Sequence, residues 1–244
     1  MAFEKTILIL AANPSNTARL RLPEEVREIQ EGLALSDGRD RYKVVSQWAV
    51  RPDDLRRALL KHQPQIVHFS GHGEGEQGLV FENESGQAKK VSSAALSRLF
   101  RLYPGVECVL LNACYSETQA TAIGQHINYV VGMTQAIGDR AAIEFSVGFY
   151  DALGYGRPIT EAYEFGLAAI DLEGLDETAT PVLKVRAAVQ REKSTSSVTD
   201  QSVMLALDEP DKLNLEAAAR SDAACPDANP GKDETIFPNS ILLL

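Results

Sequence analysis

Two short apolar segments of the chain each end in a side chain that could take part in catalysis. The segment IVHFSGHG at 66–73 delivers His72, and the segment CVLLNACYS at 108–116 delivers Cys114. A free thiol is only slightly ionised at neutral pH, so a catalytic cysteine needs a neighbouring base to take its proton. The sequence therefore predicts His72 as a general base and Cys114 as a nucleophile.

Small residues surround both candidates. Acyl transfer by a thiolate also needs hydrogen-bond donors for the developing oxyanion, and we expect the backbone N–H groups of Gly73 and Cys114 to supply them. Gly71 and Gly73 flank His72, as expected where a substrate backbone must come close.

Less specific interpretations of the same residues stay open. A Gly-His-Gly segment can be only a tight turn, and a lone cysteine is more often a buried, inert thiol than a nucleophile. We expect His68, inside its strand, to belong to the core, and Cys108 to be such an inert thiol. The four histidines and three cysteines share no metal-ligand spacing, so neither a metal nor another cofactor is expected.

Strands and helices alternate along most of the chain, with a β-hairpin expected at 78–92. The expected strands are 6–12, 42–50, the two runs that lead to His72 and Cys114, 128–133 and 180–186; the expected helices are 23–35, 53–62, 93–103, 117–126, 139–153 and 159–171. This rhythm predicts an α/β fold, with a doubly wound, mostly parallel sheet and helices on both faces. In such sheets functional groups gather beyond the carboxyl ends of the strands, where Asn13, His72 and Cys114 are all expected.

Composition and charge argue against several kinds of partner. The chain of 244 residues has a formal net charge of −10, which disfavours binding to a nucleic-acid backbone. The N-terminal apolar run is too short for a secretory signal, and no stretch approaches the roughly 18 apolar residues of a membrane span. Three cysteines without a framework spacing favour a reducing compartment. We therefore expect a cytoplasmic protein without nucleic-acid or membrane partners.

The composition changes after about residue 190. Residues 191–244 are acidic, contain proline, serine and aspartate, and lack steady periodicity. We expect a globular domain at 1–190 and a flexible C-terminal tail at 191–244. The tail contains Cys225, for which no role is expected, and ends in the apolar segment Ile241–Leu244. Docking of that segment on a partner or over the cleft, and the absence of any role, are equally open.

The two chemical motifs and several further segments resemble one family. SGHG at 70–73 followed by NACYS at 112–116 resembles the His and Cys motifs of the caspase-like cysteine peptidases, and within them the chain looks most like the CHAT family. AANP at 11–14, Gly132-Met133, the helix with Phe145 and Phe149, and PITEAY at 158–163 also recur in the CHAT pattern. The resemblance covers roughly residues 5 to 186 and is to a short form without TPR repeats.

This resemblance implies a caspase-like fold and an endopeptidase that cleaves a protein substrate, with His72 as general base and Cys114 as nucleophile. It also implies activation by a regulatory protein partner or an upstream sensor in a bacterial signalling, antiviral defence or cell-death pathway. A catalytically silent caspase-like module that recruits partners is the alternative, although such members usually lose the His or the Cys. A nucleotide-binding domain is a weaker interpretation, because the chain has no Gly-x-Gly-x-x-Gly segment and no P-loop.

The determinants of substrate specificity are less defined. Metacaspases, which cut after Arg or Lys, usually place an Asp two residues before the Cys; this chain has Asn112 there, which argues against a strongly acidic pocket. Asn112 and Asp139 are candidate substrate-binding residues. Asn13 is a further candidate, because its carboxamide could orient the imidazole of His72, although a simple turn role is equally open. The charges expected near the site are those of Asp139, Glu117, Arg19 and Arg21.

Overall fold

The computed structural model of the protein describes residues 5–187 and residue 189. No helix in that part of the chain has the length and apolar character that a membrane crossing requires. The predictions for the tail at 191–244, for Cys225 and for Ile241–Leu244 concern residues outside the described part. The boundary between domain and tail at residue 190 therefore stays a prediction.

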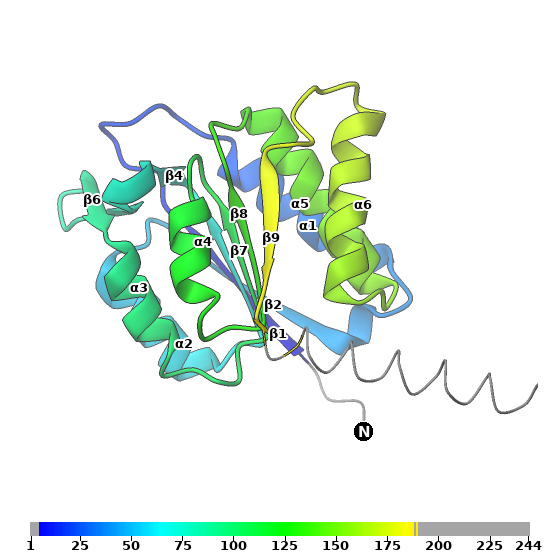
Figure 1. Ribbon diagram of the computed structural model, residues 1–244, viewed down its shortest axis with the longest axis horizontal. Helices are drawn as coiled ribbons and strands as arrows, with labels where there is room; N and C mark the ends of the chain where they lie inside the picture. The colour runs from blue at the N-terminus through cyan, green and yellow to red at the C-terminus, as the bar shows by residue number, and fades with distance from the viewer. Residues whose placement is uncertain (1–4, 188, 190–244) are drawn as a thin grey trace, which may run out of the picture. The chain divides into compact units, whose positions relative to one another are not determined.

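A six-stranded sheet forms the centre of the described domain (Figure 1). Its strands are β1 (Lys5–Ala11), β2 (Tyr42–Gln47), β3 (Ile66–Ser70), β7 (Cys108–Asn112), β8 (Tyr129–Met133) and β9 (Pro181–Val185). They lie in the order β2-β1-β3-β7-β8-β9. The first five strands run parallel, and β9 pairs antiparallel with β8. The mostly parallel sheet predicted from the alternation of strands and helices is confirmed.

Helices cover both faces of this sheet (Figure 1). One face carries α2 (Pro52–His62), α3 (Ser93–Phe100) and α4 (Glu117–Ile123), and the other carries α1 (Leu22–Leu35), α5 (Asp139–Gly154) and α6 (Ile159–Leu172). Alternate residues of β1 supply the two cores, with Leu8 and Leu10 in the first and Ile7 and Ile9 in the second. Successive side chains of a strand point to opposite faces, so a strand covered on both faces needs a continuous apolar run. The ILIL run of β1 provides it.

A smaller antiparallel sheet places His72. Its strands are β4 (His72–Gly73), β5 (Leu79–Glu82) and β6 (Ala88–Val91), and two 3₁₀ turns, η1 (Arg39–Arg41) and η2 (Gly75–Gln77), complete the elements. The hairpin predicted at 78–92 is β5 and β6, but the strand before it ends at Ser70, earlier than predicted. Gly71 lies between the end of β3 and the start of β4, where the chain passes from one sheet to the other. A Cβ at this position would lie 2.8 Å from the carbonyl oxygen of Ala12, so the passage requires glycine.

The other predicted elements are present, with ends that shift by a few residues. The strand predicted to reach Val50 ends at Gln47. Ala49 has a φ of 51°, in the left-handed region, which is incompatible with an extended strand. The helices α3 and α4 also end earlier than predicted, at Phe100 and Ile123.

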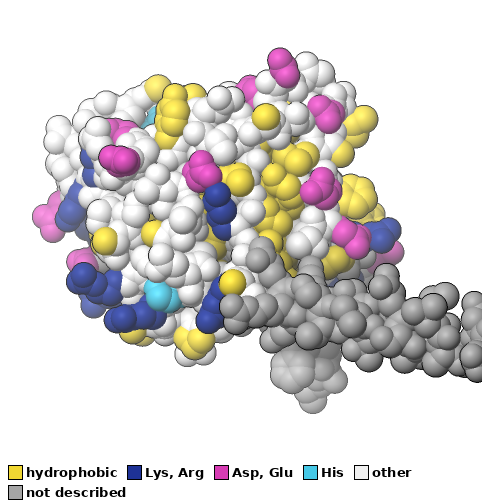
Figure 2. Space-filling view, viewed as in Figure 1, with side chains coloured by type: hydrophobic (Ala, Val, Ile, Leu, Met, Phe, Trp, Pro, Cys, Tyr) yellow, Lys and Arg dark blue, Asp and Glu magenta, His cyan; other side chains and the backbone are white. Residues whose placement is uncertain are grey.

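Part of the apolar surface near the sheet edge is not fully covered. Figure 2 shows hydrophobic side chains gathered between β9 and α6. Tyr163 and Leu167 of α6 and Leu183 of β9 are partly buried and pack against the second core. The antiparallel strand β9 therefore forms the edge of the sheet, and part of the apolar surface between β9 and α6 stays exposed to solvent.

We expect Phe149→Ala to lower the free energy of unfolding by about 3–5 kcal/mol, because the ring is fully buried in α5 and its loss leaves a cavity. The matched substitution Phe165→Ala in α6, where the residue is 50% exposed, should change this free energy by less than about 0.5 kcal/mol. Urea unfolding followed by circular dichroism measures both variants. Equal losses would contradict the assignment of the buried helix face.

Candidate active site

The carboxyl ends of β3 and β7 bring the two predicted catalytic side chains together. The strands pair in parallel with Ser70 opposite Asn112, and the Gly71 N–H donates to the Asn112 carbonyl oxygen at 3.2 Å. His72 and Cys114, two residues beyond this last pair, line one cavity of about 40 Å³. The parallel register thus carries residues that are distant in sequence to the same edge of the sheet.

Gly73 lies directly against the backbone of Cys114. A Cβ on Gly73 would lie 2.2 Å from the Cys114 carbonyl oxygen, a distance that no side chain tolerates. The close approach of these two segments therefore requires glycine, independently of the substrate approach expected from the sequence. The Cys114 N–H has no hydrogen-bond partner among the residues that the structure describes, so it is available to an oxyanion.

The loop between β1 and α1 fixes the imidazole of His72. Its Nε2 lies 2.8 Å from the carbonyl oxygen of Ala18. A carbonyl oxygen can only accept a hydrogen bond, so Nε2 is the donor in this contact and Nδ1 is the ring nitrogen left to exchange a proton with a thiol.

Asn13 contacts this loop and not the imidazole. Its Nδ2 donates to the Leu20 carbonyl oxygen at 3.2 Å, and its Oδ1 accepts from the Leu20 N–H at 3.4 Å. These two bonds close the loop that presents Ala18. The sequence suggested that the Asn13 side chain orients His72. In the structure the Ala18 backbone carbonyl oxygen makes that contact, and residue types do not reveal a backbone contact.

A strained turn follows the candidate nucleophile. Tyr115, the residue after Cys114, has a φ of 56°, a left-handed conformation that costs a non-glycine residue about 1–3 kcal/mol. The Tyr115 N–H donates to the Gln135 carbonyl oxygen at 3.1 Å, and the Ser116 hydroxyl accepts from the Met133 N–H at 3.0 Å. These bonds tie the turn to the end of β8 and so hold the strained conformation of Tyr115.

The two thiols of the described chain differ in environment. Cys114 is partly exposed, and its Sγ lies 3.8 Å from the carbonyl oxygen of Ile137. In the described part of the chain no hydrogen bond joins this thiol to His72. Cys108 is fully buried, and the resulting desolvation raises the pKa of its thiol far above the usual range, as expected for an inert residue.

A buried carboxylate lies beneath the cavity. Glu25, in the first turn of α1, is only 2% exposed. Its Oε1 accepts from Asn112 Nδ2 at 2.6 Å and from the Ser146 hydroxyl at 2.8 Å, and its Oε2 accepts from the Ser70 hydroxyl. The imidazole of His68 approaches it, with Nε2 3.2 Å from Oε1. One side chain of α1 thus connects β3, β7 and α5.

This network extends into the core through His68 and Tyr150. Both are fully buried, and His68 Nδ1 lies 3.2 Å from the Tyr150 hydroxyl. Burial by itself raises the pKa of the Glu25 carboxyl, but attraction to His68 and hydrogen bonds from Ser70 and Ser146 outweigh burial, so the pKa lies below its usual value. Glu25 is therefore a carboxylate at neutral pH.

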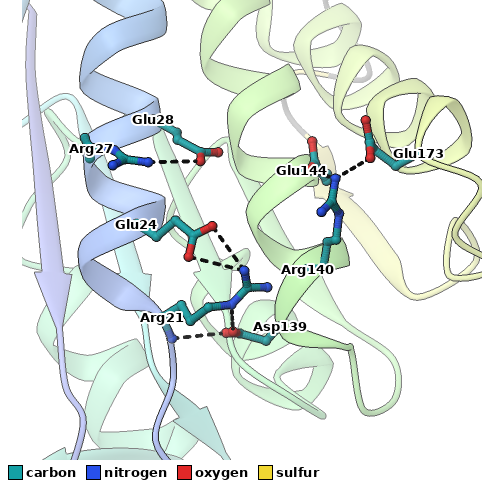
Figure 3. A network of polar contacts seen from close by, with 8 residues as sticks. All are labelled: Arg21, Glu24, Arg27, Glu28, Asp139, Arg140, Glu144 and Glu173. Atoms are coloured by element: carbon teal, nitrogen blue, oxygen red, sulfur yellow. Dashed lines mark hydrogen bonds and ion pairs between the residues drawn. The ribbon is translucent and has the colours of Figure 1, made fainter.

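Charged residues form a rim beside α1 and α5 (Figure 3). Arg21 lies between Glu24 and Asp139, with its Nε 2.7 Å from Asp139 Oδ2. Asp139, the first residue of α5, also lines the cavity. Glu117 instead pairs with Lys184 at 2.6 Å.

The cavity brings together four of the predicted residues. Asn112 and Asp139 line it with His72 and Cys114. The predicted residues outside its lining are Gly73, Asn13, Glu117, Arg19 and Arg21. Over the described residues, no group of three His, Cys, Asp or Glu side chains is arranged to hold a metal ion.

Reasoning from the sequence missed Glu25 as a part of the site and His68 as its partner. A signal for Glu25 exists: it lies on the same stripe of α1 as Leu22, Val26 and Ile29, which is buried against the sheet. An acid on an apolar stripe needs polar partners in the core. His68 is in the core, as predicted, but a lone histidine in a strand does not reveal its partner.

The fold is caspase-like. A secreted C11 cysteine protease from Bacteroides thetaiotaomicron in complex with an irreversible peptide inhibitor is similar over 70% of this chain and 60% of that chain, with a TM-score of 0.54 and 13% identity. Caspase-1 from Spodoptera frugiperda is similar over 76% of this chain and 87% of that chain, with a TM-score of 0.51 and 12% identity. At these identities the likeness shows the fold alone.

The sequence comparisons identify the family within this fold. The CHAT domain model matches residues 3–164, and the chain belongs to the CHAT-domain family. A Roc-COR-CHAT protease from an unknown prokaryotic organism is 30% identical over 174 residues, which are 68% of this chain and 16% of that protein. A probable protease of Gillisia limnaea is 24% identical over 172 residues, 68% of this chain and 30% of that protein. The chain thus spans less than a third of the length of these relatives.

We expect Glu25→Gln to lower the free energy of unfolding at pH 7 by about 1–3 kcal/mol, because charge-assisted hydrogen bonds are lost. The folded pKa of Glu25 lies below its ordinary value of 4.5, so its stabilisation is present above that pH and is lost as the pH falls below it. Urea unfolding between pH 7 and pH 3 should show a smaller acid loss in the variant than in the wild type.

Glu31→Gln, at an exposed position of the same helix, is the matched control and should leave the stability profile unchanged. An identical acid loss in the wild type and in Glu25→Gln would show that the buried carboxylate does not contribute.

Proposed function

We propose that the protein is a cysteine endopeptidase that cleaves a protein substrate with His72 as general base and Cys114 as nucleophile. The observation that supports it most is the meeting of the two side chains in one cavity at the ends of paired strands. The contact of Nε2 with the Ala18 carbonyl oxygen leaves Nδ1 as the ring nitrogen that can exchange a proton with the thiol. Relatives named as proteases support the same activity.

The proposed reaction begins with transfer of the Cys114 proton to His72 Nδ1. The thiolate attacks the peptide carbonyl carbon and forms a C–S bond, while the carbonyl electron pair moves to oxygen. The N–H groups of Cys114 and Gly73 donate to this oxyanion. Its collapse breaks the C–N bond, and the imidazolium gives its proton to the leaving amine. Water, deprotonated by His72, then hydrolyses the thioester and restores the thiol.

In the free protein the thiol faces the Ile137 carbonyl oxygen at 3.8 Å and not the imidazole. Catalytic hydrogen bonds are often loose in free enzymes and tighten when the substrate binds. We propose that rotation of the Cys114 side chain toward His72 accompanies binding. A catalytically silent module that recruits partners is the second candidate, because the dyad is not joined by a hydrogen bond in this state.

We further propose that a partner protein or a sensor regulates the domain in a bacterial signalling, defence or cell-death pathway in the cytoplasm. The matched segment makes up 16% and 30% of two relatives, so in those proteins other segments accompany it. The cysteine usage of the sequence favours the cytoplasm. Its acidic charge argues against nucleic acid as the target.

We expect Cys114→Ala and His72→Ala each to lower cleavage of a peptide library by at least about 10⁴-fold without changing the circular dichroism spectrum, because each removes a reacting group. Mass spectrometry of the products measures this loss. The matched variants Cys225→Ala and His62→Ala remove another thiol and another imidazole and should retain full activity. Cleavage that survives both dyad substitutions would contradict the proposed peptidase.

Gly73→Ala should lower kcat/KM by about 10²-fold or more, because its Cβ would meet the Cys114 carbonyl oxygen at 2.2 Å and displace the oxyanion donors. Gly105→Ala, where an added Cβ meets nothing within 4 Å, is the control and should keep its activity. Peptide cleavage at subsaturating substrate measures both. Unchanged cleavage by Gly73→Ala would show that this close approach does not matter for the reaction.

A further inference from the structure

The lining of the cavity beside Cys114 is apolar on one part and polar on another. Leu20, in the loop before α1, and Leu22, the first residue of α1, contribute apolar surface. Glu25, Ser70 and Asn112 contribute polar groups, and all three are buried. A side chain that enters this space therefore passes apolar surface and also needs a polar group that can satisfy buried acceptors.

Asn112 contributes an acceptor that is left unsatisfied. The residue is 5% exposed, and its Nδ2 lies within 3.1 Å of Glu25 Oε1, the Ala142 carbonyl oxygen and the Ser146 hydroxyl, which fixes the orientation of the amide. Its Oδ1 is buried and has no hydrogen-bond partner among the described residues. A buried acceptor without a partner costs about 1–3 kcal/mol, so this atom favours a ligand that carries a donor.

Glu25 adds a negative charge next to that acceptor. Its Oε2 accepts one hydrogen bond, from the Ser70 hydroxyl, and a carboxylate oxygen can accept two. The imidazole of His68 lies 3.2 Å from Oε1, and among the described residues no lysine or arginine side chain reaches the carboxylate. The polar lining of the cavity therefore has unused capacity for a cationic donor.

We propose that this cavity receives the substrate side chain that immediately precedes the scissile bond, and that this side chain is basic. The proposal rests on the peptidase function proposed above. The cationic group donates to Asn112 Oδ1 and to the Glu25 carboxylate, while the aliphatic part of the side chain contacts Leu20 and Leu22. Glu25 is the specificity-determining residue.

The sequence argued against an acidic pocket, because Asn112 stands two residues before the nucleophile where an Asp would provide the charge. In the structure α1 brings the Glu25 carboxylate to within 2.6 Å of Asn112 Nδ2. The charge thus comes from a different element. Asp139 also lines the cavity, but its carboxylate is already paired with Arg21 at 2.7 Å.

The size of the cavity distinguishes between the two basic side chains. A volume of about 40 Å³ holds roughly three water molecules. The compact ammonium of lysine on its unbranched stem needs less widening of this space than the planar guanidinium of arginine. We therefore expect lysine to be preferred over arginine.

The test uses the full chain and a set of peptidyl chloromethyl ketones that differ only in the residue next to the reactive group: lysine, arginine, norleucine or glutamate. Norleucine keeps the aliphatic stem of lysine and lacks the ammonium. The rate of Cys114 labelling is followed by intact-protein mass spectrometry. We expect the lysine probe to react about tenfold to a hundredfold faster than the norleucine probe, and the glutamate probe to be slowest.

Glu25→Gln should remove most of the lysine preference, measured within the variant as the ratio of the lysine rate to the norleucine rate, while the exposed control Glu31→Gln should keep the wild-type ratio. Norleucine reacting as fast as lysine in the wild type would overturn the basic-pocket proposal whatever the folding of the variant. A lysine preference that persists in a folded Glu25→Gln would overturn the assignment of Glu25.

Iodoacetamide alkylates thiols without occupying a side-chain pocket, so it separates a failure of the peptidase function from a failure of the basic pocket. Alkylation of Cys114 by iodoacetamide without labelling by any of the peptidyl probes would contradict the peptidase function itself. Labelling by the peptidyl probes with another order of rates would contradict the basic pocket alone. Iodoacetamide rates that match between the wild type and Glu25→Gln would show that the substitution leaves the thiol intact.

Discussion

The parallel pairing of β3 with β7 is the constraint on which the rest of the site depends. Both strands lie in the middle of the sheet, and their residues are fully buried between helices on the two faces. A slip of one residue would turn every side chain to the opposite face, so burial holds the register. With Ser70 opposite Asn112, the chain leaves the sheet at one edge and places His72 beside Cys114. The geometry of the candidate site is thus a consequence of core packing.

The Glu25 carboxylate is the second feature that unites the fold and the site. A buried charge is costly unless hydrogen bonds and an ion pair compensate for it, and here Asn112, Ser146, Ser70 and His68 do so. These partners come from three elements besides α1. The same contacts that hold α1 and α5 against the sheet therefore place a negative charge under the cavity, where it can act on a substrate.

Backbone groups complete the site. The Ala18 carbonyl oxygen contacts Nε2 of His72, the Cys114 N–H has no partner among the described residues, and Tyr115 adopts a strained φ of 56° directly after the thiol. Gly73 allows the two segments to touch. Glycine apart, such contributions depend on loop geometry and are almost independent of side-chain type.

Residue types and spacing alone determined the class of fold, the pair His72 and Cys114 and the CHAT motifs, because hydrophobic periodicity and strand-end punctuation are local signals. Tertiary structure alone decided which groups surround that pair. Glu25 looks like an ordinary acid of a helix start until α1 docks and buries it beside Asn112, and the Ala18 carbonyl has no signature in any side chain. Contacts between elements distant in sequence depend on packing and loop conformation, which no local pattern records.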